Sequence, residues 1–538
     1  MLGLPSVCPH RENSPYRVGH MRPAVTRVQI AALLAVAQDY AFGQPPGCQL
    51  RAAVLGQRLA VAAGCDADEC ATTWWTSALR FLGCTGHAYE VAMIYGDEIE
   101  LRAKSLEIDV ANPMELMRMI ASHAGPSRSG LGRARSVLAA LVGGRRSAEF
   151  NFRTACEVAD ELAKRLGLEE AIRTSLATNF ERWNGRGMPT GAKGTAIPRP
   201  MRIAQIAQEF EVLARLTGVS AAIQTVQERS DGAYEPSLVD LLVTGAEGWW
   251  AAVEAADPWD AALAVAPPAA PLDDAETRDA LLVLADFADL KSPWTAGHSR
   301  AVAALVAAAS GRGVGNRADG GDAERAEAAA LVHDLGRVAV SNLIWDKPGP
   351  LTRDERDRAE THALVTEQLL RRVPFTAALA GPAGSAHERI DGSGYHRRAT
   401  GAQLDDVHRV IAAADCYQAM TSDRPHRVAL SRDEAAQALR AMSAAGRLDG
   451  EAVERVLDAA GHRRAARAAL PAGLTPREAE VIRLVALGLT TRQIAERLTI
   501  SVKTADHHVQ HIYTKLGVST RGAAALFAIE HGILPSDG

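Results

Sequence analysis

The feature that most constrains this chain is a series of histidine and aspartate residues in the segment 298–415. Its members are His298, His333, Asp334, His362, His387 and Asp415. Imidazole and carboxylate groups are ligands that divalent transition metals accept. The adjacent pair His333 and Asp334 follows an apolar run typical of a helix, and the other four residues fall on separate predicted segments. Ligands that converge from several helices indicate a helical bundle with a metal site in its core.

Asp334 is the candidate bridging ligand of this site. A carboxylate has two oxygens and can contact two cations at once. A bridged pair of metal ions lowers the pKa of a water molecule and clamps a phosphodiester during in-line displacement. The residues therefore predict a phosphohydrolase site that uses one or two divalent metal ions.

The same segment contains the loop AHERIDGSGYH and the stretches LKSPWTAGHS and TSDRPHR. Together with the HD pair, this pattern resembles the HD-GYP family, which are metal-dependent phosphohydrolases that open cyclic di-GMP. The resemblance implies two metal positions, with iron or manganese as the expected ions. One position would be held by His298, His333, Asp334 and Asp415, and the other by His362 and His387, with Asp334 shared.

The resemblance also implies roles beside the metal ligands. Asp334 and Arg337 would take part in catalysis. Glycines in the DGSGYH loop allow a ligand to approach the backbone closely, so Gly394 and Tyr395 are candidate ligand contacts. Arg424 and Arg427 are candidates for phosphate or guanine contacts, since a guanidinium group fits both. Solvated surface charge is the alternative for these two arginines.

Three positions depart from the family pattern. Ala386 stands where the family has a second histidine before the loop glutamate, so we expect the second metal to bind more weakly. Arg337 replaces the lysine after the HD pair, and a guanidinium group cannot donate a proton at neutral pH. His396 replaces a proline in the loop, which makes its imidazole a further candidate ligand.

The first half of the chain repeats this pattern in a degraded form. The segment ERWNGRGMPTGAKGTAIPRPMRIAQIAQ from Glu181 aligns without a gap with ERIDGSGYHRRATGAQLDDVHRVIAAAD from Glu388. In place of His298, His333, Asp334, His387 and Asp415, the first copy carries Cys48, Arg80, Phe81, Phe180 and Gln208. An arginine at a ligand position would repel a cation. We therefore expect a first helical domain that has kept the fold and lost the metals.

The end of the chain has the capping pattern of short successive helices. Thr475 and Glu478 have the spacing of a capping box at a helix start. Thr490 and Ser501 predict the starts of two more helices, and a fourth is expected from Arg521. A tight turn before the third helix is the geometry that enters a DNA major groove. This segment resembles a LuxR-type helix-turn-helix.

The outward positions of the third helix are the candidate DNA contacts. They are Lys503, Thr504, Asp506, His507 and Gln510. A threonine hydroxyl can bond phosphate or a base edge, and a glutamine amide can read adenine. From Gly473 onward the chain has seven Lys or Arg and six Asp or Glu, so one module would bind double-stranded DNA weakly. We expect a homodimer on a two-fold site, and protein binding is the alternative for this module.

The composition predicts a helical protein with several cores. Aromatic residues make up only 5% of the 538 residues, whereas Ala, Leu, Arg and Glu are frequent. The expected fold is all-α, with two HD-type helical bundles, the first degenerate, followed by a four-helix LuxR-type module. The expected boundaries are a disordered tail at 1–22, a degenerate HD-GYP-like domain at 23–245, a Pro/Ala-rich linker at 246–275, an HD-GYP domain at 276–462, a second linker at 463–472 and a DNA-binding domain at 473–535.

Composition also indicates where the protein resides. No apolar run approaches the roughly 18 residues of a membrane span, and the first residues lack an apolar stretch of signal-peptide length. The seven cysteines are scattered and form no CxxC pair, which favours free thiols in a reducing compartment. We expect a cytoplasmic protein without a membrane partner.

The residues leave three interpretations of the second copy open. It is an active phosphodiesterase for a cyclic dinucleotide such as cyclic di-GMP, a catalytically dead nucleotide sensor, or a hydrolase for another phosphate ester, as in the wider HD superfamily. The six retained ligand-type residues argue against an inert site, and the three departures argue against full activity. In each case we expect a DNA-binding transcriptional regulator.

Overall fold

The computed structural model describes residues 24–110, 112–123, 130–311, 320–462, 471–486 and 489–518, with a few single positions after 518. Over these ranges the chain forms α-helices and short 3-10 helices, with isolated bridges and no β-strand, which confirms the predicted all-α fold. None of the described helices has both the length and the apolar character of a membrane span. The predicted tail at 1–22 lies outside the described residues. The chain divides into two compact units, residues 1–460 and 461–538.

The first copy of the repeat is a bundle of helices with an inserted segment between η1 and α8. Its elements are α1 (Arg27–Ala41), α2 (Cys48–Ala62), α3 (Ala67–Ala78), η1 (Leu82–His87), α4 (Ala88–Tyr95), α5 (Glu98–Ser105), α6 (Pro113–His123), α7 (Gly130–Arg165), α8 (Glu170–Ala177), η2 (Gly194–Ala196), α9 (Arg199–Thr217), α10 (Val219–Glu228), α11 (Pro236–Glu254) and α12 (Pro258–Ala264).

The second copy repeats the central helices of the first. Its elements are α13 (Asp274–Asp289), α14 (His298–Ser310), α15 (Gly320–Val332), η3 (Leu335–Ala339), α16 (Asn342–Trp345), α17 (Arg353–Leu370), α18 (Pro374–Gly384), η4 (Gly401–Gln403), α19 (Asp406–Met420), α20 (Arg432–Ala444) and α21 (Gly450–Ala459).

Equivalent helices of the two copies begin in the same way. α2 and α14 each start directly after a glycine in the left-handed region, Gly47 (φ 99°) and Gly297 (φ 76°). Glycine adopts this conformation without the steric cost that a Cβ atom brings. The first helical residues are Cys48 and His298, which are the two residues that the sequence alignment pairs.

The loops after Glu181 and Glu388 are also built alike. One carboxylate oxygen of Glu181 accepts hydrogen bonds from the backbone N–H groups of Thr190 and Gly191, at 2.7 and 3.2 Å. Glu388 accepts from the backbone N–H groups of Arg397 and Ala399, at 2.7 and 2.9 Å. A buried carboxylate that ties a loop to itself fixes the loop conformation, so the gapless alignment of these loops corresponds to one shared structure.

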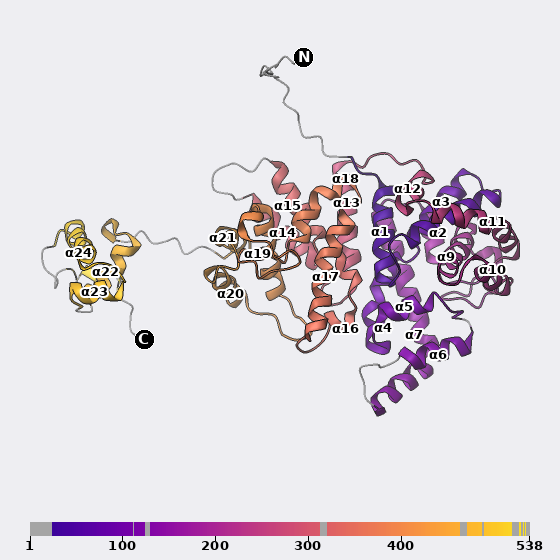
Figure 1. The fold of residues 1–538 in the computed structure, drawn as a ribbon, viewed down its shortest axis with the longest axis horizontal. Helices are drawn as coiled ribbons and strands as arrows, with labels where there is room; N and C mark the ends of the chain where they lie inside the picture. The colour runs from indigo at the N-terminus through magenta and orange to yellow at the C-terminus, as the bar shows by residue number, and fades with distance from the viewer. Residues whose placement is uncertain are drawn as a thin grey trace, which may run out of the picture. The chain divides into compact units, whose positions relative to one another are not determined.

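The two copies pack against each other in a nearly symmetric way. α1 contacts η3 and α17 of the second copy, and α13 contacts η1 and α7 of the first. Figure 1 shows α1 beside the helices of the second copy. One hydrophobic cluster extends from Val25 to Leu457, so both copies share a single core.

Part of the Pro/Ala-rich segment 246–275, which its composition predicts to be a linker, is helical and packed. α11 continues to Glu254, and α12 begins after Asp257, whose carboxylate accepts from the backbone N–H groups of its first turn. Trp259 and Ala262 are buried, and the Ala262 carbonyl accepts a hydrogen bond from the Trp74 indole at 3.0 Å. Alanine has the highest helix propensity and proline is favoured in the first turn, so this composition also suits a packed helix.

The unit 461–538 contains η5 (Pro471–Gly473), α22 (Pro476–Ala486), α23 (Thr491–Arg497) and α24 (Val502–Leu516). Thr475 and Glu478 form the predicted capping box, and Thr490 and Ser501 cap the next two helices as predicted. Buried residues from all three α-helices form a separate core. The predicted fourth helix from Arg521, and most of the predicted linker at 463–472, lie outside the described residues.

Candidate metal centre and substrate cavity

Five elements of the second copy bring the predicted metal ligands together. His298 is the first residue of α14, and His333 and Asp334 follow α15 directly. His362 lies on α17, His387 in the loop after α18, and Asp415 on α19. All six side chains are at least nine-tenths buried, so they form one enclosed cluster.

The Asp334 carboxylate divides the imidazoles into two pairs. Its Oδ2 atom lies 3.4 Å from Nε2 of His298 and 3.4 Å from Nε2 of His333. Its Oδ1 atom lies 3.4 Å from Nε2 of His362 and 3.4 Å from Nε2 of His387. Each oxygen thus faces its own pair of nitrogen ligands, which is the geometry of a carboxylate that bridges two ions.

Asp415 completes the first of these positions. Its Oδ1 atom lies 3.2 Å from Nε2 of His298 and 3.8 Å from Nε2 of His333, and its Oδ2 atom lies 3.3 Å from Nδ1 of His387. Two groups of possible ligand atoms result, one with His298, His333 and Asp334 and the other with Asp334, His362 and His387.

Hydrogen bonds from the outer ring nitrogens orient three of the histidines. Nδ1 of His298 contacts the side-chain oxygen of Gln418. Nδ1 of His333 donates to the Ala330 carbonyl at 2.8 Å, and Nδ1 of His362 donates to the Ala359 carbonyl at 2.6 Å. A donor role at Nδ1 leaves the Nε2 lone pair for a metal ion, as in most histidine metal sites.

The inner atoms of the cluster have the unfilled valences that a metal site requires. Nε2 of His298, His333 and His362 and Oδ2 of Asp334 are buried and have no hydrogen-bond partner. Buried polar atoms are normally satisfied. Ligand atoms about 2.1 Å from a shared ion lie about 3 Å apart at right angles and about 3.4 Å apart at the tetrahedral angle. The donor types and their separations therefore fit divalent metal ions.

The surroundings of the cluster shift the pKa values of its carboxylates and imidazoles. Burial alone would raise the pKa of Asp334, but Arg337 and the imidazoles hold it well below its usual range. Burial alone would lower the pKa of His298. The carboxylates of Asp334 and Asp415 outweigh burial and raise this pKa to about 9. Burial lowers the pKa of His362 to about 4, so its imidazole is neutral at pH 7, the form that binds a metal ion.

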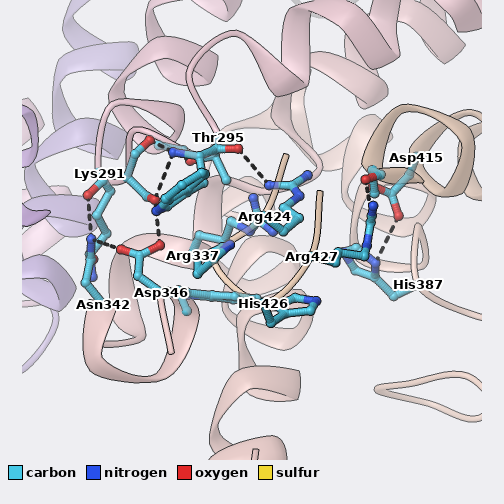
Figure 2. A pocket seen from close by; sticks show the side chains of 16 residues that line it. Lys291, Thr295, Arg337, Asn342, Asp346, His387, Asp415, Arg424, His426 and Arg427 are labelled. Carbon is cyan, nitrogen blue, oxygen red and sulfur yellow. Dashed lines mark hydrogen bonds and ion pairs between the residues drawn. The ribbon is translucent and has the colours of Figure 1, made fainter. Parts of the chain in front are cut away.

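A cavity of about 290 Å³ opens beside the cluster. His387 and Asp415 lie at one side of it in Figure 2, and Lys291, Asn342 and Asp346 at the other. Three arginines lie between the two groups in this view: Arg337, Arg424 and Arg427. Trp294 and Trp345 also line the cavity. Guanidinium groups bind phosphates, and aromatic rings stack on nucleobases, so the lining suits a nucleotide.

The two predicted arginine contacts lie in the cavity wall, and each is partly held by the protein. Arg424 donates to the Trp294 carbonyl at 2.9 Å. Arg427 donates to the carbonyls of Ala419 and Met420 at the end of α19. Arg427 therefore also fixes the segment that carries both arginines, a structural role that its sequence context does not reveal.

Gly394 and Tyr395, the predicted ligand contacts of the loop, are not among the described residues that line this cavity. A Cβ atom on Gly394 would lie 2.4 Å from Cα of Glu388, so close backbone packing requires the glycine. The Tyr395 ring stacks on the His387 imidazole, with 5.1 Å between centroids and 15° between planes. Tyr395 therefore packs on His387, and Gly394 lets its loop approach the backbone of Glu388, the residue after His387.

The structure also locates the three departures from the family pattern. NH1 of Arg337 lies 3.0 Å from Oδ2 of Asp334, and its guanidinium stacks 4.5 Å from the centre of the Trp345 ring. Ala386 is wholly enclosed in the hydrophobic core. His396 contacts Glu367 at 3.2 Å rather than the metal cluster, so it does not replace the missing histidine.

The first copy cannot form the same centre. A Cβ atom added to Gly83 would meet the Ala155 carbonyl, and one added to Gly336 would meet the His362 carbonyl. Ala155 of the first copy is therefore equivalent to His362 of the second. Phe81 stacks on Phe42 with 4.1 Å between ring centroids, and burial lowers the pKa of Arg80 to about 10. Aromatic packing and a partly buried cation thus occupy the ligand positions of the first copy.

Several further residues line the cavity that the sequence did not single out as site residues. Trp294, Asn342, Trp345, Asp346 and His426 all line the cavity. Trp294 and His426 lie within stretches that match the family pattern, which is a usable signal. Asn342 and Trp345 belong to the short helix α16, and only the fold brings them to the site.

The predicted DNA contacts form one exposed surface of α24. Lys503, Thr504, Asp506, His507 and Gln510 are all exposed, whereas Ala505, Val509 and Ile512 are buried. Val502, an apolar residue in the first turn of α24, is 51% exposed. An exposed apolar side chain at the start of this helix can contact a thymine methyl group, so Val502 joins the candidate DNA contacts.

Family models match both units of the chain. The HD domain model matches residues 282–452. The model described as bacterial regulatory proteins, luxR family, matches residues 472–528.

The chain is similar to characterised proteins over most of its length. It is 30% identical over 411 residues to the 3′3′-cGAMP-specific phosphodiesterase 3 of Vibrio cholerae serotype O1, which covers 75% of this chain and 88% of that protein. It is 34% identical over 179 residues to the 3′3′-cGAMP-specific phosphodiesterase 1 of the same organism, covering 33% and 40% of the two chains.

A crystal structure of a cyclic GMP-AMP specific phosphodiesterase from V. cholerae has a similar fold. It matches with a TM-score of 0.56 and 26% identity, and the match covers 82% of this chain and 99% of that chain. The chain therefore belongs to the HD-GYP family of HD-domain phosphohydrolases, and it carries a LuxR-type helix-turn-helix domain at its C-terminal end.

Proposed function

We propose that this protein is a DNA-binding regulator whose second HD-GYP copy binds divalent metal ions and hydrolyses a cyclic dinucleotide. The observation that carries the proposal is Asp334, whose two oxygens each face a separate pair of imidazole nitrogens beside a cavity lined by three arginines. The relative that matches 75% of the chain is specific for 3′3′-cGAMP, so this dinucleotide is the first candidate substrate, with cyclic di-GMP second.

The residues of the site have distinct parts in this reaction. The six ligand residues would hold a pair of iron or manganese ions. These ions would polarise the phosphodiester and lower the pKa of a bound water molecule. Arg337, Arg424 and Arg427 would bind the phosphates, and Trp294 and Trp345 would contact the bases. Water adds to phosphorus, one P–O bond to a ribose oxygen breaks, and that oxygen takes the proton, which gives a linear dinucleotide.

The test is a hydrolysis assay on the full chain. Protein loaded with Fe²⁺ or Mn²⁺ is incubated with 3′3′-cGAMP or cyclic di-GMP, and linear product is separated by chromatography. Asp334→Asn should abolish the reaction, whereas Cys48→Ala, at the matched position of the first copy, should leave it unchanged. If neither dinucleotide gives a linear product with either metal, the hydrolase assignment is contradicted.

A nucleotide sensor without turnover is the second candidate. Ala386 and Arg337 favour it, because the first withholds a metal ligand and the second cannot protonate a leaving group. The same preparations distinguish the two functions: a sensor would bind the dinucleotide in a calorimetric titration and return it intact.

A further inference from the structure

A carboxylate from the degenerate copy is buried in the wall of the second copy's cavity. Glu98 is the first residue of α5, in the inserted segment of the first copy, and it is fully buried. It accepts a hydrogen bond from Nζ of Lys291 at 2.7 Å and from the hydroxyl of Ser341 at 2.8 Å. It also accepts from the backbone N–H of Asn342, with 3.1 Å to each oxygen.

The groups that Glu98 holds are themselves part of the cavity. Lys291 and Asn342 line it. The Asn342 amide donates to the Lys291 carbonyl at 2.7 Å and to Asp346 at 2.8 Å. Asp346 also accepts from the Ser292 hydroxyl at 2.7 Å. The network therefore joins two separate stretches of the cavity wall through a residue of the other copy.

The same wall leads to the metal cluster. Asn342 begins α16, and Trp345 ends it. The Trp345 ring lies against the Arg337 guanidinium and 5.1 Å from the His362 imidazole, and Arg337 pairs with Asp334. α4 of the inserted segment packs on α16 from the other side. A displacement of α16 would therefore move both an aromatic wall of the cavity and the support of Arg337.

Removal of the Glu98 charge would leave a buried cation without its partner. The Lys291 side chain is 3% exposed and its ammonium has one carboxylate partner among the described residues. Deletion of one member of a buried ion pair costs far more than the pair contributes net, because the remaining charge lacks both water and its partner. The wall must then rearrange to admit water or another acceptor.

We propose that Glu98 is a positioning residue for the substrate cavity, by which the degenerate copy holds Lys291 and the start of α16 in place. The first copy is thus a structural part of the nucleotide site although it lacks metal ligands. This inference rests on the proposed function for its effect on substrate, and on the structure alone for its effect on the wall.

The test uses the full chain with Glu98→Gln, which keeps the shape and removes the charge. Hydrogen–deuterium exchange in the segment 341–347 should rise by about tenfold or more, while metal content stays at the wild-type level. The KM for 3′3′-cGAMP should rise by about tenfold with a smaller change in kcat, since binding and not chemistry depends on this wall. Glu107→Gln is the matched control, because it removes a partly exposed carboxylate that pairs with Lys104.

Each outcome bears on one of the two claims. Unchanged exchange in 341–347 would overturn the positioning role, whatever the protein hydrolyses. Raised exchange with an unchanged KM would overturn the link to substrate. A wild-type protein that hydrolyses no dinucleotide, combined with raised exchange in the variant, would contradict the proposed function and leave the positioning role intact. If Glu98→Gln fails to fold, Ser341→Ala removes one contact of the network and should shift exchange in the same direction by less.

Discussion

At the scale of single residues, the metal centre depends on the difference between two equivalent positions in the repeat. His333 and Asp334 meet four other ligands in the second copy, whereas Arg80 and Phe81 meet an asparagine and a phenylalanine in the first. The backbone at both places is the same kind of turn after a helix. The chemistry of a few side chains, and not the fold, therefore determines which copy has the ligand set of a metal site.

Metal content should follow this difference. His333→Ala and Asp415→Ala each remove a ligand that no neighbouring side chain replaces, so purified variants should lose most of the metal that the wild type carries. Cys48→Ala, at the position equivalent to His298, should retain it. Elemental analysis by mass spectrometry measures this, and equal metal content in the wild type and His333→Ala would refute the assignment of the centre.

At the scale of the elements, local signals and distant contacts differ in how far a sequence reveals them. The capping residues Thr475, Thr490 and Ser501 were predictable because a cap depends on residues three positions apart. The clustering of the six ligand-type side chains was predictable from their order in the sequence, and the structure brings them together. The contact between Glu98 and Lys291 joins residues 193 positions apart, and no periodicity or motif in a single sequence indicates such a pair.

Composition misled the prediction where burial decides the structure. Alanine and proline in the segment 246–275 are typical of a linker, but Trp259 and Ala262 pack α12, within that segment, against the first bundle. Val502 shows the opposite case. Its apolar side chain would be expected in the core with Val509 and Ile512, but it lies in the exposed first turn of α24. In both cases the outcome depends on what packs against the helix.

The capping box of α22 should make the stability of the helix-turn-helix unit depend on pH. Burial would raise the pKa of Glu478, but hydrogen bonds from Lys515, the Thr475 backbone and His511 hold it at about 2, against an ordinary value of 4.5. Because the pKa is lower in the folded state, this stabilisation is complete above about pH 4.5 and is lost as the pH falls toward 2. It amounts to about 3 kcal/mol.

Glu478→Gln should remove this component of the pH dependence. At neutral pH, hydrogen exchange of the α22 and α24 backbone in the full chain should become faster, and the difference from the wild type should shrink below about pH 4. Glu480→Gln removes an exposed carboxylate on the same helix, paired with Arg477, and serves as the control. A constant difference between Glu478→Gln and the wild type from pH 7 to pH 3 would contradict the assignment.

The exposed row on α24 should determine DNA affinity. Lys503→Ala removes a cation near the start of the helix that is expected in the groove, so the Kd for operator DNA should rise by about tenfold and the salt dependence should become shallower by about one unit of slope. Thr514→Ala, in the last turn of the same helix, should have no effect. Fluorescence anisotropy at several salt concentrations measures both quantities, and equal losses in the two variants would argue against this surface as the DNA contact.

At the scale of the whole molecule, the proposed nucleotide site and a LuxR-type unit lie in one chain, in parts with separate cores. A ligand changes DNA affinity only by the difference in its affinity for the states that bind DNA well and poorly. Coupling of this kind is reciprocal, so DNA should change the affinity for the dinucleotide by the same factor. This reciprocity makes the regulatory role testable without knowledge of the target genes.

We expect the full chain to bind a two-fold DNA site at least about tenfold more tightly than the isolated segment 473–538, because the paired chains engage two half-sites at once. The experiment should use Asp334→Asn protein, so that 3′3′-cGAMP is not consumed during the measurement. Gel shifts at one salt concentration, with and without dinucleotide, should then give different Kd values for the full chain and identical values for the isolated unit. If the full chain and the isolated unit bind equally well and the dinucleotide affects neither, the regulatory link fails.

DNA binding itself is tested independently by selection from random sequences, where the absence of any enriched site would contradict it.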